Sequence, residues 1–236
     1  MIDLFVTTYG RPELFQQSFQ SLLASTDRSS IRLTVVVDGG FEKGTDLKIL
    51  DHTDHVLWHR NTLGLGPSIN QALSHIANLN TYFDNQKSDF VCMCQDDIVY
   101  VSGWLEKLVR VYALFSKRMK LGFVTGHEAI EHQTTGEIKF GDVTLLIKPW
   151  IRATNMLTTT EYFLSMYPIP RIDPETGKER ARPHNGMGSS VDWHFIRNHP
   201  NSVCKTGRIN IVYPGLIKHI GFDQSTWLKR PLPEAV

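Results

Sequence analysis

The run Phe90-Val91-Cys92-Met93-Cys94-Gln95-Asp96-Asp97 sets an apolar stretch directly before two adjacent carboxylates. A continuous apolar run of this length, rich in residues that are often buried, predicts an interior strand over residues 90–94. The next segment carries Leu105, Leu108 and Tyr112 at helical spacing, which predicts a helix of about 15 residues. A buried strand that ends in acids and leads into a helix is typical of α/β proteins.

The residues before this run repeat the alternation of strand and helix. Apolar runs over 2–7, 31–37 and 55–59 predict strands, and helical periodicity after Pro12 and after Gly66-Pro67 predicts helices between them. Strands separated by single helices favour βαβ units with right-handed crossovers. The predicted fold class is therefore α/β, with a Rossmann-like, mainly parallel sheet flanked by helices.

The second half of the chain is less regular and richer in loops. Three strands and a short helix are predicted there, over residues 122–125, 143–147, 209–213 and 191–197. The segment 167–187 carries four prolines among polar residues, and so long a stretch inside a compact chain is typical of a functional loop or lid. Because no linker separates the halves, we expect one domain over residues 1–236.

Composition excludes several classes of protein. The chain has 25 basic and 24 acidic residues, a net charge of +1, which argues against attachment to nucleic acid by bulk charge. Its hydrophobic content of 41% argues against disorder.

Location is predicted from the cysteines and the N-terminus. The three cysteines lack zinc-ligand spacing, which predicts reduced thiols packed as small hydrophobes. Residues 1–6 have no basic segment typical of a signal peptide, and no apolar run approaches the ~20 residues of a membrane span. We therefore expect a cytoplasmic protein without a membrane span.

Polar residues gather at the ends of three predicted strands. These ends are Thr7-Thr8-Tyr9, Asp38 and Gln95-Asp96-Asp97, and ligands of open parallel sheets bind beyond the carboxyl ends of the strands. Adjacent carboxylates repel one another unless a cation or a hydroxyl-rich ligand offsets their charge. Mg²⁺ or Mn²⁺ accepts one or two carboxylates together with phosphate oxygens. The alternative is that the pair caps the turn into the helix near Ser102.

Two common nucleotide motifs are missing. Gly64-Leu65-Gly66 lacks the third glycine of G-x-G-x-x-G and follows the third predicted strand, whereas the dinucleotide motif follows the first. No G-x-x-x-x-G-K-[ST] sequence occurs. Dinucleotide-binding and P-loop sites are therefore excluded.

An ordered set of motifs resembles a known family. The set consists of Thr7-Thr8-Tyr9-x-Arg11-Pro12, Val35-Val36-Val37-Asp38-Gly39, Asn61-x-x-Gly64-x-Gly66-x-x-x-Asn70 and Asp96-Asp97. In order and spacing it resembles the N-terminal half of family 2 glycosyltransferases, which have the GT-A fold. The resemblance covers roughly residues 2–105, with Gln95 at the place where the family often has an acid.

The resemblance implies roles for individual residues. It implies that the donor, a nucleoside diphosphate sugar, is bound within residues 1–105, and that residues 106–236 bind the acceptor. Asp96 would face the ribose, and Asp97 would hold the metal on the diphosphate. The remaining donor-binding residues that it implies are Thr7, Thr8, Tyr9, Arg11, Asp38 and Asn70.

The C-terminal half resembles the family more loosely. Asp192, after Gly186-x-Gly188-Ser189-Ser190, matches the acid that is the general base in the family. His219 matches the histidine that often completes the metal site. Alternatively, Asp192 is a helix N-terminal residue favoured by the dipole, and His219 is a surface or cap histidine. The rival candidates for the base are Glu128, Glu131, Asp142 and Asp173.

The function implied is a metal-dependent, inverting glycosyltransferase that uses Mn²⁺ or Mg²⁺ and a nucleoside diphosphate sugar, with uridine as the expected nucleoside. The acceptor is not readable: a saccharide is the first expectation, and modified nucleic acid or protein are the others. Two alternatives stay open, a nucleotidyltransferase of sugar activation and a non-catalytic module that binds sugar nucleotides or glycans.

Overall fold

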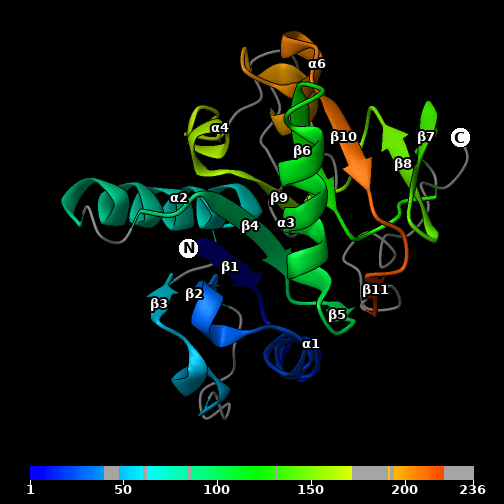
Figure 1. Cartoon of the computed structure of the whole chain (residues 1–236). Helices are drawn as coiled ribbons and strands as arrows, with labels where there is room; N and C mark the ends of the chain where they lie inside the picture. Colours follow the sequence, from blue (N-terminus) through cyan, green and yellow to red (C-terminus); the bar gives the residue numbers. More distant parts are fainter. Residues whose placement is uncertain are drawn as a thin grey trace, which may run out of the picture.

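The computed structural model describes residues 1–39, 48–60, 63–83, 87–130, 132–171, 191 and 194–220. Within these residues, nine strands form one mixed sheet in the order β3-β2-β1-β4-β9-β6-β10-β8-β7 (Figure 1). These strands are β1 (Ile2–Thr8), β2 (Ile31–Val37), β3 (His55–Trp58), β4 (Phe90–Gln95), β6 (Leu121–Thr125), β7 (Gly136–Phe140), β8 (Val143–Lys148), β9 (Asn155–Thr159) and β10 (Ile209–Val212).

The N-terminal part of the sheet is parallel, as the sequence predicts. Strand β1 lies between β2 and β4, with Ile2 opposite Ile31 on one side and Phe90 on the other. Strand β3 pairs in parallel with β2. Because these four strands run the same way, their carboxyl ends meet at one edge of the sheet.

The C-terminal part of the sheet is mixed, which the sequence pattern does not reveal. Strand β9 pairs antiparallel with both β4 and β6, and it separates these two strands. Strand β10 is parallel to β6, whereas β8 and β7 complete the sheet as an antiparallel hairpin. The predicted α/β architecture with a mainly parallel sheet is thus confirmed, with two strands, β8 and β9, running against the others.

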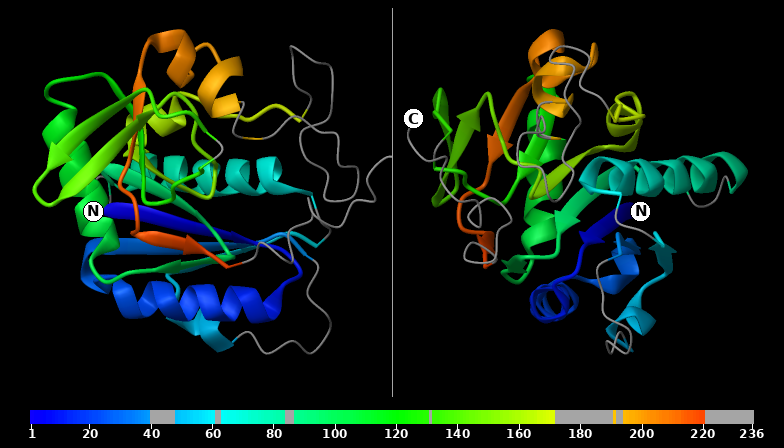
Figure 2. Two further views of the ribbon diagram at one scale, coloured as in Figure 1. Left: turned by 90° about the vertical axis from the view of Figure 1, so that its right-hand side faces the viewer. Right: turned by 180° about the vertical axis from the view of Figure 1, so that it is seen from behind.

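Helices cover both faces of the sheet (Figure 2). The α-helices described are α1 (Pro12–Ser25), α2 (Leu65–Tyr82), α3 (Trp104–Phe115), α4 (Thr160–Leu164) and α6 (Val203–Thr206). Alternation along β1 divides the core in two: Leu4 and Val6 pack in the cluster that contains α1 and α3, and Phe5 packs in the cluster that contains α2 and α4. The left view of Figure 2 shows α1 below the sheet and α2 above it.

The turn after β4 leads into a short strand before the next helix begins. Asp96 and Asp97 form a turn between β4 and β5 (Ile98–Tyr100), and β5 pairs antiparallel with β11 (Ile217–His219). The helix α3 begins later, at Trp104, with Gly103 as its N-cap, and has 12 residues in place of the predicted 15. The acid pair therefore does not cap this helix, and that alternative is wrong.

Other predictions for the second half need adjustment. The short helix expected over 191–197 is described as a π-helical segment over His194–Asn198, while residues 192–193 lie outside the described residues. Cys92 and Cys94 are buried free thiols with their Sγ atoms 3.9 Å apart, as predicted, whereas Cys204 is exposed. Most of the proposed lid, 167–187, lies outside the described residues. No described helix has the length and apolar character needed to cross a membrane.

Candidate functional site

The first acid of the pair, Asp96, is held against the end of β1. Thr8 Oγ1 donates a hydrogen bond of 2.8 Å to Asp96 Oδ2, and the backbone N–H of Tyr9 donates to the same oxygen at 3.2 Å. Asp96 is only 1% exposed. The predicted donor-binding residues Thr8, Tyr9 and Asp96 are therefore brought together, and Thr7 lies beside them, opposite Gln95 in the sheet.

Arg11 bridges both acids from the start of α1. Its Nη1 donates to Asp97 Oδ2 at 2.9 Å, and its Nη2 donates to Asp96 Oδ1. One guanidinium thus serves two buried carboxylates, because Asp97 is itself only 5% exposed. The three charges sum to −1, so this cluster retains an excess of negative charge.

The two carboxyls differ in their proton affinity. Burial raises the pKa of Asp96 to about 6; Arg11 opposes this rise, and the charge of Asp97 adds to it. Burial also raises the pKa of Asp97, but its contacts with His219 and Arg11 outweigh burial and lower the pKa below the usual range. Asp97 is therefore the member of the pair that stays ionised across the neutral range.

His219 lies beside Asp97 because two distant segments pair. Strand β11 sets His219 opposite Ile98, and the N–H of Ile220 donates to the Asp97 carbonyl oxygen at 2.8 Å. As a result, His219 Nε2 lies 3.4 Å from Asp97 Oδ2. The two predicted metal ligands are therefore neighbours.

The acid cluster has one feature that fits a divalent cation. Asp97 Oδ1 is buried and has no hydrogen-bond partner among the described residues, and a buried carboxylate oxygen normally has one. Among the described residues, no group of three or more His, Cys, Asp or Glu side chains converges to hold a metal. Asp97 and His219 therefore fit a cation that takes its remaining ligands from phosphate oxygens and water, as Mg²⁺ commonly does.

Asp38 lies at the same edge of the sheet, after β2, but its carboxylate binds protein groups. His59 Nδ1 lies 2.7 Å from Asp38 Oδ1, and the N–H groups of Leu63 and Gly64 donate to Oδ1 and Oδ2 at 2.9 and 2.7 Å. Gly64 has a φ of 97°, a conformation that favours glycine. Asp38 thereby joins His59, after β3, to Leu63 and Gly64, which precede α2.

Asn70, also predicted to bind the donor, forms a clamp on the main chain of Ile169. Its Nδ2 donates to the Ile169 carbonyl oxygen at 2.8 Å, and the Ile169 N–H donates to Asn70 Oδ1 at 2.7 Å. The side-chain amide therefore ties α2 to the segment that follows α4.

The predicted general base cannot be placed, because Asp192 lies outside the described residues, as do its rivals Glu131 and Asp173. Glu128 follows β6, with an oxygen 3.8 Å from Lys148 Nζ. Asp142 lies in the exposed turn between β7 and β8.

Sequence reasoning missed two histidines at this edge of the sheet. His59 directly follows β3 and meets Asp38, and the ring of His127, which follows β6, lies 6.0 Å from the ring of His219 between centroids. Both follow a strand that the sequence predicts. The rule that identified the other strand ends would have found them if it had been applied to every strand.

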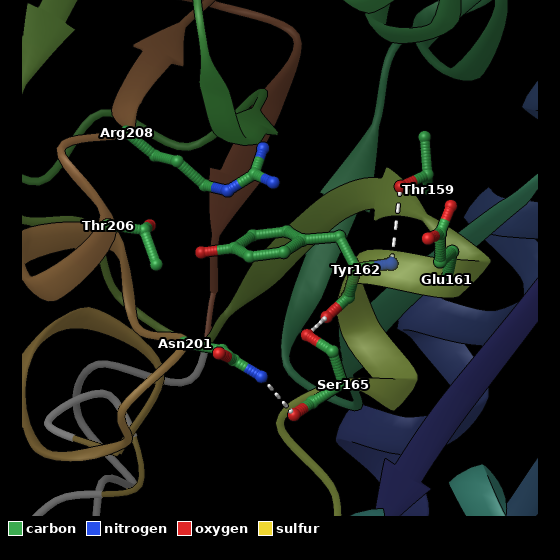
Figure 3. Close-up of a pocket in the computed structure, with 7 residues that line it drawn as sticks. All are labelled: Thr159, Glu161, Tyr162, Ser165, Asn201, Thr206 and Arg208. Carbon is green, nitrogen blue, oxygen red and sulfur yellow. Dashed lines mark hydrogen bonds between the residues drawn. The ribbon is translucent and has the colours of Figure 1, made fainter.

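A pocket of about 290 Å³ lies at the opposite edge of the sheet (Figure 3). Thr159, at its border, pairs with the first residue of β4. The guanidinium of Arg208 stacks on Tyr162, with Cζ 3.9 Å from the ring centroid, and Asn201 Nδ2 donates to the Ser165 carbonyl oxygen at 2.9 Å. The pocket therefore lies at the other end of β4 from the acid cluster. Its lining includes these contacts between its own residues.

Similarity to known proteins is found in structure and not in sequence. No family model matches the chain, and no curated protein matches it. A fragment of S. aureus TarS in complex with UDP-GlcNAc has 12% identity and a TM-score of 0.54, over 91% of this chain and 56% of that chain. A longer TarS structure gives 12% and 0.51, over 90% of this chain and 34% of that chain.

A second protein shares the fold. The mannosyltransferase PcManGT from Pyrobaculum calidifontis, in complex with GDP-Man and Mn²⁺, has 13% identity and a TM-score of 0.51, over 73% of this chain and 48% of that chain. The present chain spans about a third to three fifths of the lengths of these proteins. Its α/β architecture is therefore a fold that glycosyltransferases use.

Proposed function

We propose that the protein is a family 2-like glycosyltransferase that moves a sugar from a nucleoside diphosphate sugar to an acceptor hydroxyl, with inversion and with Mn²⁺ or Mg²⁺. One observation carries the proposal: Asp96 and Asp97 are buried at the carboxyl edge of the sheet with a single guanidinium between them. Such a cluster is costly unless a further cation binds. The orphaned Asp97 Oδ1 marks the place for it.

The residues of the cluster have distinct roles in this proposal. Asp97 and His219 hold the cation, and Thr8 fixes Asp96 toward the ribose, with Thr7 and Tyr9 alongside. Arg11 has 23% of its side chain exposed, so its guanidinium can turn from the acids to a phosphate oxygen, a geometry that arginine favours. When bound, the cation supplies Lewis-acid stabilisation of the departing diphosphate.

The structural neighbours support the class of donor. TarS is described with UDP-GlcNAc and PcManGT with GDP-Man and Mn²⁺. We propose that the present chain also binds a nucleoside diphosphate sugar, with uridine as the nucleoside. In this proposal the chain is one cytoplasmic domain in which residues 1–105 bind the donor and residues 106–236 bind the acceptor. A saccharide is the first acceptor to test.

The decisive experiment is calorimetric titration of UDP into the whole chain, with and without Mn²⁺, followed by a donor-hydrolysis screen across nucleotide sugars. We expect UDP affinity to rise at least about tenfold with Mn²⁺, because the metal joins the diphosphate to Asp97. Formation of a nucleotide sugar from a nucleoside triphosphate and a sugar phosphate would instead identify a nucleotidyltransferase. Glycan binding without nucleotide binding would identify a non-catalytic module.

Asp192 is the proposed general base, and its variant separates catalysis from binding. Asp192→Asn should keep donor affinity yet slow transfer by roughly 10²–10⁴-fold, because a positioned proton acceptor is lost. The loss should fall on kcat more than on KM, since the proton moves in the transition state. Asp142→Asn, in an exposed turn, is the matched control. A loss under about tenfold would place the base elsewhere.

A further inference from the structure

The carboxylate of Asp38 is nearly saturated by protein donors. Oδ1 receives bonds from His59 Nδ1 and the Leu63 N–H, and Oδ2 receives one from the Gly64 N–H. Since a carboxylate has about four acceptor positions, only one is left. The three bonds also hold the carboxylate in place against the protein. Asp38 is therefore poorly placed to contact a ligand directly.

Asp38 instead fixes the state of His59. An ionised carboxylate only accepts hydrogen bonds, so Nδ1 of His59 carries the proton and donates. In the neutral imidazole, Nε2 then holds a lone pair, because the partner of one ring nitrogen sets the state of the other. Among the described residues Nε2 has no hydrogen-bond partner, and 9% of the His59 side chain is accessible.

The strand order places this histidine at a suitable distance from the acids. His59 follows β3 and Asp38 follows β2, whereas Asp96 follows β4, with β1 between. The end of β2, with Asp38, is two strand spacings of ~4.8 Å from the end of β4, and the end of β3, with His59, is three. Asp38 and His59 are therefore roughly 10–15 Å from Asp96 along this edge of the sheet. That span suits a nucleoside diphosphate whose phosphates lie at Asp97. Leu63, whose N–H bonds the same carboxylate, has 50% of its surface exposed and is available for an apolar contact with a base.

We propose that His59, held in one tautomer by Asp38, contacts the nucleobase of the donor and selects bases that carry a ring N–H. This inference rests on the proposed function and specifies its donor. The lone pair of Nε2 accepts from N3–H of uracil or N1–H of guanine. Cytosine N3 and adenine N1 are themselves acceptors. At this position each would place its lone pair against the lone pair of Nε2, so no hydrogen bond would form and the two atoms would repel each other. Asp38 is a positioning residue, and His59 makes the contact.

The test uses nucleoside diphosphates that differ in a single hydrogen-bond donor. With Mn²⁺ and the whole chain, calorimetry should show UDP binding at least about tenfold more tightly than CDP and than N3-methyluridine diphosphate, the usual scale for an unpaired buried polar group. If guanine is the preferred base, GDP and its N1-methyl derivative should show the same ratio. Equal affinities, or tighter binding of CDP or ADP, would overturn the inference.

Two variants separate the roles of His59 and Asp38. His59→Phe keeps a ring but removes the acceptor, so the ratio between UDP and its N3-methyl derivative should fall to within about twofold, with pyrophosphate affinity unchanged. Asp38→Asn should lower the ratio partly and shift the ¹⁵N resonances of the His59 ring toward a mixture of tautomers. Retention of the full ratio in His59→Phe would assign the contact to another residue and refute the proposal.

The controls distinguish the failure of this inference from that of the proposed function. Pyrophosphate binding and circular dichroism report whether each variant is folded with an intact acid cluster. If the wild-type chain binds no nucleoside diphosphate, both proposals fail together. If it binds them without regard to the base, the glycosyltransferase proposal stands and the role of His59 falls. Should His59→Phe not fold, Asp38→Asn tests the role of His59: an unchanged ratio between UDP and its N3-methyl derivative in that variant would overturn the proposal.

Discussion

Two contacts between arginine and aspartate lie at opposite edges of the same sheet. At the amino edge, Arg32 Nε and Nη2 donate to the two oxygens of Asp3 at 2.5 and 2.8 Å, with 8% and 1% of the side chains accessible. At the carboxyl edge, Arg11 divides its guanidinium between Asp96 and Asp97. The residue types are the same, but the charge balance differs.

The difference indicates which contact is structural and which serves a ligand. Asp3 and Arg32 face each other in the register of β1 and β2, and the guanidinium meets this carboxylate in a two-bond geometry that arginine favours. In the part of the chain that the structure describes, Arg11 meets two carboxylates, and Asp97 Oδ1 has no hydrogen-bond partner. At the amino edge a guanidinium meets both oxygens of one carboxylate and joins two strands, whereas at the carboxyl edge one guanidinium is shared by two carboxylates, which leaves capacity for another cation.

The largest expected effect is on activity at the carboxyl edge. Asp97→Asn should reduce metal-dependent transfer by at least about 10³-fold, because a neutral amide cannot offset the charge of a Lewis-acid cation. Thermal unfolding should stay close to that of the wild type. Asp89→Asn, just before β4 and with 79% of its side chain accessible, is the matched control and should remain active. Full activity of Asp97→Asn with Mn²⁺ would refute the metal assignment.

The second effect is on stability at the amino edge. Arg32→Met should lower the free energy of unfolding by about 3–5 kcal/mol, because Asp3 is left buried without its cation. Arg28→Met is the control: Arg28 pairs with Asp54 at 3.0 Å, but both side chains are at least one third accessible, so about 0–1 kcal/mol is expected. Denaturant unfolding measures both. Equal losses would show that burial does not distinguish the two pairs.

The third prediction uses the raised pKa of Asp96, about 6. Between about pH 4, near the unfolded pKa, and pH 6, the folded chain holds this proton more tightly than the unfolded chain, so stability falls as pH rises. In metal-free buffer the wild type should lose roughly 2–3 kcal/mol relative to Asp96→Asn between pH 4 and pH 7. Parallel profiles for the two proteins would show that Asp96 titrates normally.

The smallest effect concerns metal binding without nucleotide. Arg11→Met should bind Mn²⁺ about tenfold more tightly than the wild type, because a competing cation leaves the two carboxylates. The same variant should bind UDP more weakly, since Arg11 is proposed to move to a phosphate. Titration with each ligand measures the two opposite shifts. A change of the same sign for both ligands would contradict the proposed exchange.

The sequence predicts the parallel part of the fold well, because each of its strands is an apolar run that ends at polar residues. The remainder depends on tertiary pairing. Strand β9 (Asn155–Thr159) is polar at both ends and becomes buried because it lies between β4 and β6. β5 and β11 have three residues each and exist only as a pair. No local pattern announces such strands.

The candidate site was predictable to the same extent. Thr8 ends β1, and Asp96 and Asp97 follow β4. The sequence predicts that these strand ends meet at one edge of the sheet, and the structure adds that β1 and β4 are neighbours. The partners of other residues come from far along the chain: Asp38 meets His59, 21 positions away, and Asn70 meets Ile169, 99 positions away. Sequence spacing carries no information on whether such a side chain faces a ligand or the protein itself.

The clamp between Asn70 and Ile169 has a consequence for how this chain can diverge. Asn70 bonds only main-chain atoms at position 169, so the clamp itself does not depend on the side chain there, which in Ile169 is buried in the core. Any residue with an N–H group satisfies the clamp at this position, and proline alone does not. The attachment to α2 can therefore be kept in relatives whose sequences differ after this position.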